Sequence, residues 1–321
     1  MKSYDMPIFA ALIAVLLFAP LALYPVFLMK VLCFALFAVA FNLLIGYVGL
    51  LSFGHAMFFG FAAYISAYTV KWWGWSPEFG ILAGTAVAML MGVVAGSIAI
   101  RRQGIYFAMV TLALAQMVYF FCLQAPFTGG EDGIQAVPRR SMFGFLDISN
   151  DFVFYYVVLV IFAIGFLIIH RTIHSPFGQV LKAIRENEQR AVSLGYRVDQ
   201  YKLMAFVISA TLAGLAGATK AIVFQLASLT DVMWQMSGEV VLMTLVGGMG
   251  TVFGPMVGAA VIVTMQNYLA GFGEWVLVIQ GAIFVVTVLL FRRGIVGEIA
   301  AFLESRSARK ALAAEGASQA A

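Results

Sequence analysis

The sequence GYVGLLSFGHAMFFGFAAY, from Gly46 to Tyr64, carries more information about the architecture of the protein than any other part of the chain. It is apolar enough for a membrane, yet it holds four glycines, a serine and a histidine where a simple membrane anchor would carry leucine. An unpaired backbone amide is costly in lipid, so irregular backbone at membrane depth occurs only inside protein or beside a water-filled cavity. The stretch therefore predicts an interrupted helix that faces the interior of a larger membrane protein.

The composition of the whole chain indicates a protein that crosses a membrane many times. Of its 321 residues, 63% are hydrophobic and 11% are charged, whereas soluble domains carry roughly 25% charged residues. Apolar runs of about 20 residues, the length that crosses the hydrocarbon core, recur from end to end of the chain. We therefore expect an all-α polytopic membrane protein with a single transmembrane domain over residues 1–293 and a cytoplasmic tail over residues 294–321.

The apolar runs predict about ten transmembrane helices with broken, glycine-rich segments. Their expected positions are residues 8–28, 31–51, 53–70, 79–100, 105–124, 151–170, 203–226, 238–249, 252–270 and 272–291. The first run, from Pro7 to Met29, exceeds the apolar part of a signal peptide and has no convincing cleavage site, so we expect it to remain as a span. Residues 238–270 allow one broken helix or two short ones, and we prefer two.

The positions of the basic residues predict the orientation of these helices. Ten crossings that start in the cytoplasm place fourteen of the 19 Lys and Arg on the cytoplasmic side. Four fall outside, namely Lys30, Lys71, Arg139 and Arg140, and Lys220 falls within a span. Since cytoplasmic loops carry an excess of Lys and Arg, both termini are predicted to be cytoplasmic.

The sequence holds no pattern typical of an enzyme or of a metal site. It has three histidines, no His-Glu-x-x-His array, no GxSxG motif and no paired aspartates within the apolar runs. A phosphate-binding GxxxxGK[ST] loop is also absent, so any ATP must be bound by another polypeptide. The cysteines, Cys33 and Cys122, lie in apolar runs without metal-ligand spacing and are expected to be buried.

Few ionisable residues are expected at membrane depth, which argues against coupling to an ion gradient. The candidates are Lys220, Glu239 and His55. Lys220 is expected to extend its charged end to the nearer membrane surface, and Glu239 is expected to be hydrated near the start of a span. His55 is either a hydrogen-bonded structural residue or a ligand or proton site.

The most informative polar segment is HSPFGQVLKAIRENEQRAVSLGYRVDQYKLMAF, from His174 to Phe206. Ser175 is placed to cap a helix that begins at Pro176, and Gly195 is placed to end the helical stretch that follows. One side of the first helix is apolar and the other carries charges of both signs, which predicts one or two amphipathic helices able to dock in a partner's groove. A loop lying on anionic lipid is the alternative.

Three stretches of the chain occur together in one known family. They are NLLIGYVGLLSFGHAMFFGFAAY (residues 42–64), SPFGQVLKAIRENEQRAVSLGYRVDQYKLMAFVISATLAGLAG (residues 175–217) and GGMGTVFGPMVGAA (residues 247–260). In this order they resemble the LivM-type permeases of branched-chain amino-acid ABC importers, and the similarity runs from about Asn42 to Arg293. The resemblance implies the permease subunit of an ATP-driven, binding-protein-dependent importer in the bacterial cytoplasmic (inner) membrane.

The resemblance also implies partners, cofactors and substrates. The importer would contain a second related permease subunit, two cytoplasmic ATP-binding subunits and a periplasmic or extracellular substrate-binding protein, surrounded by membrane lipid and without nucleic acid. No cofactor or metal is expected on this chain, and the partner subunits would use ATP and Mg. The expected substrates are branched-chain or other apolar amino acids. Related importers for urea or aromatic acids, a self-contained channel and a membrane scaffold are the alternatives.

Three groups of residues are the candidate sites that the resemblance implies. The coupling group would transmit movement of the ATP-binding subunits, with Arg185, Glu186 and Asn187 in contact with them: Ala183, Ile184, Arg185, Glu186, Asn187 and Gly195. Ala183 and Ile184 would form its packed face. The second group would line the translocation route or pack helices closely: Gly46, Gly49, Ser52, Gly54, His55, Gly60, Gly247, Gly248, Gly250, Gly254 and Pro255. The third group, Thr128, Gly129 and Gly130, would form an external loop facing the binding protein, although Arg139 and Arg140 after it are more basic than expected.

Overall fold

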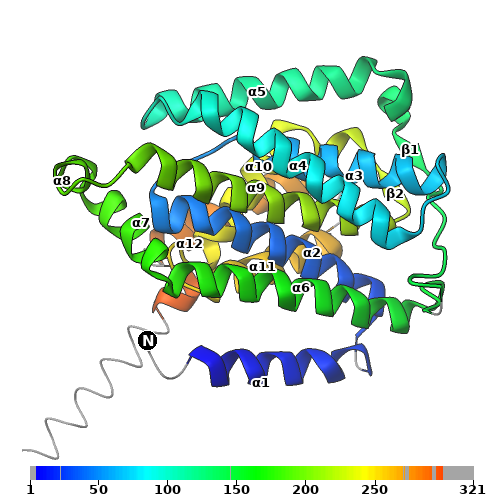
Figure 1. The fold of residues 1–321 in the computed structure, drawn as a ribbon. Coiled ribbons are helices and arrows are strands. Elements are labelled where there is room, and N and C mark those ends of the chain that lie inside the picture. Colours follow the sequence, from blue (N-terminus) through cyan, green and yellow to red (C-terminus); the bar gives the residue numbers. More distant parts are fainter. Residues whose placement is uncertain are drawn as a thin grey trace, which may run out of the picture.

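The computed structural model describes residues 5–21, 23–144, 146–269, 271, 275–290 and 294–298, and most of them are helical (Figure 1). The apolar runs form helices because a backbone in lipid must satisfy its own hydrogen bonds. The α-helices are α1 Asp5–Phe18, α2 Pro25–Asn42, α3 His55–Lys71, α4 Pro77–Ala99, α5 Ile105–Gln124, α6 Asp151–His174, α7 Pro176–Glu186, α8 Glu188–Ser193, α9 Val198–Val223, α10 Trp234–Gly247, α11 Gly254–Leu269 and α12 Trp275–Leu290.

The remaining elements are short. α2 continues into a π-helical turn, η2, over Leu43–Val48. The 3-10 turns are η1 Ala19–Leu21, η3 Pro126–Thr128, η4 Gly130–Asp132 and η5 Leu229–Asp231. Two strands, β1 Ile134–Gln135 and β2 Leu226–Ala227, pair antiparallel with Ile134 opposite Ala227.

Five of the described helices are long and apolar enough to cross a membrane: α2 with its π turn, α4, α5, α6 and α9. The other helices at predicted span positions, α1, α3, α10, α11 and α12, have 14 to 17 residues. At 1.5 Å per residue they cover about 21 to 26 Å, somewhat less than the ~30 Å hydrocarbon core. The prediction of an all-α polytopic membrane protein is confirmed, and each predicted span overlaps a helix.

The predicted boundary between the first two spans is wrong. The first helix ends at Phe18 and α2 begins at Pro25, whereas the sequence placed the break near residues 29–30. Proline is favoured at the first position of a helix and disrupts a helix interior, so Pro20 and Pro25 set the break. Lys30, which was expected in an external loop, therefore lies within α2.

The core of the molecule is built around α2, α3 and α9, which are buried along most of their length. In Figure 1, α2 and α9 run through the bundle between α6 on one side and α4 and α5 on the other. α4 approaches this core closely because four of its residues are glycine. A Cβ added at Gly84 would lie 2.5 Å from the carbonyl oxygen of Ala62 in α3, and one at Gly92 would lie 2.8 Å from Ala210 in α9. Small residues thus bring these helices together.

The bundle has two ends, which we call the α7 end and the β1 end (Figure 1). The α7 end holds α7, α8 and the turn between α4 and α5, where Gln103 donates a hydrogen bond to Glu188 at 2.9 Å. The β1 end holds both strands and the turn between α3 and α4. Three tryptophans of that turn, Trp72, Trp73 and Trp75, are exposed, as aromatic residues often are at a membrane surface.

Residues 234–269 form a helical hairpin, so the preference for two short helices over one broken helix is confirmed. α10 and α11 pack against each other, and a Cβ added at Gly258 would lie 2.8 Å from the backbone nitrogen of Gly247. The turn between them, residues 248–253, is possible because Gly248 and Gly250 adopt positive φ angles of 119° and 74°, which favour glycine.

The predicted cytoplasmic tail falls mainly on residues 299–321, which lie outside the described residues. Residues 294–298, assigned to the tail from the sequence, are helical. Gly294 is buried, and a Cβ added there would lie 2.5 Å from the backbone nitrogen of Gly248. The chain therefore returns to the turn of the α10–α11 hairpin after α12.

Candidate functional site

The segment between α6 and α9 forms two consecutive helices, as the sequence predicts. The Ser175 hydroxyl accepts a hydrogen bond from the backbone N–H of Gly178 at 3.3 Å, and Pro176 is the first residue of α7. Asn187 ends α7, and its side chain caps α8 by accepting the N–H of Arg190 at 3.0 Å. Gly195 follows α8 with a φ of 87°. Local capping therefore sets the corner between the two helices.

The apolar face of α7 packs against the body of the protein. Leu181 and Ile184 are buried, and Ile184 packs with Ala191 of α8 and Val198 of α9. Of the two residues predicted for the packed face, Ile184 is buried against this chain and Ala183 is exposed, and the role of both in coupling stays a prediction. The helical period places Ala183 about 100° away from Ile184, toward solvent.

Two of the residues predicted to contact a partner, Glu186 and Asn187, are exposed at the end of α7. Arg185 is exposed as well, but its guanidinium donates a hydrogen bond to the backbone carbonyl of Gly46 in the π turn. A Cβ added at Gly49 would lie 3.1 Å from Cγ of Arg185. A Cβ added at Gly250 would lie 3.3 Å from Nη1 of the same side chain. Arg185 therefore contacts backbone of both broken segments, which the sequence did not predict.

Asn42 joins the same two segments from the other side. Its side-chain N–H donates to the carbonyl of Thr251 at 2.9 Å, and its side-chain oxygen accepts the N–H of Gly250 at 3.0 Å. Asn42 is 1% exposed, so its end of both hydrogen bonds is buried. Sequence reasoning missed this residue, although a lone Asn inside an apolar run was a usable signal, because a buried carboxamide requires partners.

We call this contact the junction and define it as Asn42, Gly46, Arg185, Gly250 and Thr251. A Cβ added at Gly46 would lie 2.7 Å from the backbone nitrogen of Gly250, so the close approach requires glycine there. Gly46 lies in the π turn, a structure that is rare and often found at functional sites. The junction thus links α7, the end of α2 and the turn of the α10–α11 hairpin.

His55 occupies a fully paired polar position in the core. The Ser209 hydroxyl donates to the carbonyl of Ala40 at 2.6 Å, so its oxygen accepts the Nε2–H of His55 at 2.9 Å. Nδ1 is then the acceptor, and Ser52 donates to it at 3.0 Å while accepting the N–H of Gly54 at 3.2 Å. Every polar atom has a partner when the imidazole is neutral and protonated on Nε2.

Aromatic rings enclose His55 and keep water away. Phe41, Phe58 and Phe206 place their ring centroids 5.0, 5.7 and 5.8 Å from that of the imidazole. The described residues contain no group of three or more His, Cys, Asp or Glu that could hold a metal ion. Of the two roles considered from the sequence, the geometry of His55 matches that of a structural residue.

The other predicted residues of the first broken segment lie in close packing. A Cβ added at Gly54 would lie 2.7 Å from the carbonyl oxygen of Thr111 in α5, and one at Gly60 would lie 2.7 Å from Asp231. In the second broken segment, Gly247, Gly254 and Pro255 are buried at the base of the hairpin turn. These positions serve close packing, and their role in lining a route stays a prediction.

Lys220 has a partner inside the chain, and its extension to the membrane surface stays a prediction. Its ammonium group donates to both carboxylate oxygens of Asp231 at 2.6 Å. Asp231 is 2% exposed, and a buried carboxylate is stabilised by pairing with an opposite charge. Glu239 is partly buried in α10 and accepts a hydrogen bond from Gln266 of α11 at 3.1 Å; it was expected to be hydrated.

The predicted external loop folds into a tight turn at the β1 end. The Thr128 side chain is fully buried, and its hydroxyl faces the carbonyl oxygens of Cys122 and Ala125 at the end of α5. Gly129 and Gly130 follow with positive φ angles. Thr128 therefore stabilises the loop from inside, and contact of this loop with a partner stays a prediction.

The basic pair after this loop has partners within the chain. Arg139 donates to Asp151 at 2.6 Å and to the carbonyl of Val223 at 2.5 Å, which joins the start of α6 to the end of α9. Arg140 donates to the carbonyl of Gly74 at 3.0 Å. These contacts give both arginines partners within the chain and hold the β1 end together.

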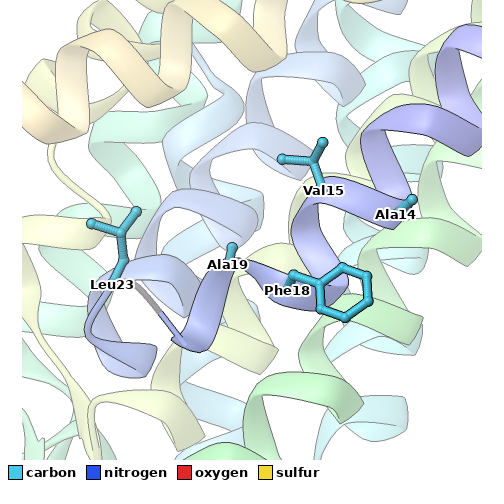
Figure 2. Close-up of a pocket in the computed structure, with 5 residues that line it drawn as sticks. All are labelled: Ala14, Val15, Phe18, Ala19 and Leu23. Atoms are coloured by element: carbon cyan, nitrogen blue, oxygen red, sulfur yellow. The ribbon is translucent and has the colours of Figure 1, made fainter.

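A cavity of about 550 Å³ lies beside α1 and is lined by Ala14, Val15, Phe18, Ala19 and Leu23 (Figure 2). All five side chains are apolar. None of them can orient a polar solute through a hydrogen bond, so we do not place the functional site there.

Comparisons with known proteins show the family of the chain. Residues 25–288 match the family described as "Branched-chain amino acid transport system / permease component". The high-affinity branched-chain amino acid transport system permease protein LivM of Escherichia coli (strain K12) is 28% identical over 282 residues, which cover 79% of this chain and 65% of that protein. The protein of the same name from Salmonella typhimurium shows the same identity and coverage.

A permease for a different solute is also similar. The ribose import permease protein RbsC of Bacillus subtilis (strain 168) is 29% identical over 199 residues, which cover 56% of this chain and 58% of that protein. No solved structure matches the chain. The matched region spans 65% of the length of the two LivM proteins and 58% of the length of RbsC, in each case less than two thirds.

Proposed function

The chain belongs to the family of branched-chain amino acid transport system permease components, and from this premise we propose that it is the transmembrane permease subunit of an ATP-driven, binding-protein-dependent importer. The observation that carries the proposal is the junction. Arg185 joins α7 to the backbone of the π turn, and Asn42 joins the end of α2 to the α10–α11 hairpin. A displacement of α7 would therefore be passed to membrane helices through hydrogen bonds.

The exposed side of α7 and α8 supports a partner at this end of the molecule. Ala183, Glu186 and Asn187 are exposed next to the buried apolar face, and an amphipathic helix of this kind can dock in a partner's groove. In the proposal, two ATP-binding subunits contact this surface in the complete importer and use ATP and Mg, and this chain contacts a second related permease. This chain converts the movement of α7 into a change of its membrane helices.

The charge distribution supports an orientation. Basic residues collect at the α7 end, on α7, α8, the last turn of α6 and the neighbouring turns: Arg101, Arg102, Arg171, Lys182, Arg190 and Arg197. Since basic residues favour the cytoplasmic side, we place the α7 end and both termini in the cytoplasm. The β1 end, with the loop of Thr128, then faces the substrate-binding protein outside the cytoplasmic membrane.

The proposed substrates are branched-chain or other apolar amino acids. Two of the similar proteins are named as permeases for branched-chain amino acids, and one is named as a permease for ribose. Similarity to these proteins alone therefore allows other solutes. An amino acid is a zwitterion with a net charge near zero, which suits a chain whose described charges inside the membrane are largely paired. Selectivity is shared with the separate binding protein.

The test is uptake of radiolabelled leucine, ribose and urea by cells that lack this chain and by the same cells with the chain restored. Loss of leucine uptake alone, with recovery on restoration, supports the proposal. Loss of ribose or urea uptake instead would show that the chain serves an importer, but an importer of that solute and not of leucine. Unchanged uptake of leucine in the deletion strain, with no other transporter for it present, would contradict the proposed function.

A further inference from the structure

A small cavity of about 160 Å³ lies between α5 and the start of α10. It is lined by Gln116, Tyr119, Met233, Trp234 and Gln235. Gln116 lies eight residues before the end of α5, which is about 12 Å along the helix at 1.5 Å per residue. The cavity therefore opens beside the middle of a helix that is long enough to cross the membrane, and not beside the end of that helix.

Two carboxamides line this cavity without a partner in the described part of the chain. Gln116 is partly exposed and Gln235 is exposed, and neither side chain makes a hydrogen bond to another described residue. Polar side chains at membrane depth generally face water, protein or a ligand, because lipid offers them no hydrogen bond. This face of the protein therefore requires a polar neighbour that the chain does not supply.

Gly238 lies one turn beyond Gln235 on the same side of α10, and the fold gives it no reason to be glycine. A Cβ added at Gly238 would meet nothing within 4 Å, whereas one added at Gly247 of the same helix would collide with backbone of α11. Gly238 has an ordinary helical φ, and glycine inside a helix is about 1 kcal/mol less favourable than alanine. The space beside Gly238 is open for something outside the chain.

We propose that this surface contacts the transported solute, a small zwitterion with an apolar side chain. We call it the glutamine face and define it as Gln116, Tyr119, Trp234, Gln235 and Gly238. The inference rests on the proposed transport function and names the part of this chain that the solute meets. It places the route along α5 and α10, whereas the glycines of the first broken segment lie in close packing.

The chemistry of the glutamine face suits such a solute. A carboxamide can donate hydrogen bonds to a carboxylate and accept one from an ammonium group. Tyr119 and Trp234 add apolar surface for the side chain, a combination typical of small-molecule sites. A cavity of about 160 Å³ admits a small molecule but is far too narrow for a helix of a second subunit, whose diameter is about 10 Å.

The first test compares Gly238→Ala with Gly281→Ala in the whole importer. Gly281 is likewise a glycine within a helix, α12, with nothing within 4 Å of an added Cβ, so both changes improve helix propensity equally. We expect Gly238→Ala to lower leucine uptake about tenfold or more, since one misplaced methyl group changes discrimination by roughly 10- to 200-fold. Gly281→Ala should transport like the unchanged protein.

The second test measures access to water and to the solute. Single cysteines replace Gln116, Gln235 or Met117, which is 68% exposed on another side of α5; the native Cys33 and Cys122 are buried and provide a low background. In membranes containing the whole importer, a water-soluble thiol reagent should modify positions 116 and 235, and leucine should slow that reaction. Position 117 should react slowly and without protection.

The outcomes separate this inference from the proposed function. If the unchanged importer takes up leucine but Gly238→Ala does so equally well, the inference is wrong and the function stands. Cysteines at 116 and 235 that do not react, or that react without protection by leucine, also overturn it, and cross-linking of either to the second permease would assign the face to that subunit. An unchanged importer that takes up no amino acid overturns the proposed function itself.

Discussion

Arg185 and its neighbour Glu186 have different roles at the end of α7: Arg185 contacts the rest of this chain, and Glu186 is available to a partner. The Arg185 guanidinium bonds the carbonyl of Gly46, whereas Glu186 is exposed to a partner. A hydrogen bond to a charged group contributes about 1.5–3 kcal/mol. We expect Arg185→Ala to leave the ATP-binding subunits attached but to lower uptake per ATP hydrolysed by about tenfold or more.

Co-purification of the ATP-binding subunits, together with uptake and ATP hydrolysis in the same vesicles, measures this prediction. Glu186→Ala is the control, because it should weaken attachment of those subunits and leave the ratio of uptake to hydrolysis unchanged. If Arg185→Ala detaches the subunits and keeps that ratio, Arg185 acts at the partner surface and the internal contact does not matter.

A second prediction for a single residue concerns His55 and the stability of the folded protein. His55→Ala removes the partner of the Ser52 hydroxyl and leaves space among three aromatic rings. Leaving a buried polar group unpaired costs about 1–3 kcal/mol, and thermal unfolding of the purified protein in detergent should show a loss of at least that size. Uptake by the surviving protein should keep its dependence on pH, and a variant of normal stability with an altered pH profile would make His55 a proton site.

At the scale of elements, the α10–α11 hairpin depends on one side chain of a different helix. Asn42 makes two hydrogen bonds to the turn of residues 248–253. Asn42→Leu keeps a branched side chain of similar shape but removes both hydrogen bonds, so backbone hydrogen exchange in the turn should become faster while α5 and α6 exchange as before. The same rate in the turn of both proteins would show that the hairpin holds its position without Asn42.

The helices themselves were largely predictable, because long apolar runs bounded by polar turns leave few alternatives in lipid. The first break was misplaced because Pro20 and Pro25 stand within an unbroken apolar run, where hydropathy gives no boundary and only the preference of proline does. The amphipathic pattern predicted which side of α7 is buried. It could not predict the direction of Arg185, because a long side chain can cross from an exposed position to the backbone of another element.

The candidate sites were less predictable than the helices, because their contacts join residues far apart in sequence. Lys220 pairs with Asp231 in a loop that local patterns assign to solvent. Asn42 meets Thr251 across 209 residues. Gly238 resembles any other glycine in the sequence, and only the open space beside it distinguishes it from the glycines that pack.

At the scale of the whole molecule, the two ends should lie on opposite sides of the membrane. Glu186→Cys at the α7 end and Glu131→Cys at the β1 end are both at exposed positions, and the native cysteines are buried. An impermeant thiol reagent added to intact spheroplasts should modify position 131 and not 186, and inside-out vesicles should give the reverse. Modification of both positions from one side would contradict the order of crossings.

The π turn of Leu43–Val48 also restricts which deletions the chain can accept during evolution. A π turn carries one residue more than the α-helical turn it replaces, and each residue rotates a helix by about 100°. Deletion of one residue there would restore a regular helix, leave the hydropathy almost unchanged and turn the Gly46 carbonyl away from Arg185. Relatives that retain Arg185 and Asn42 should therefore show no gap between positions 42 and 46, however freely their loops vary in length.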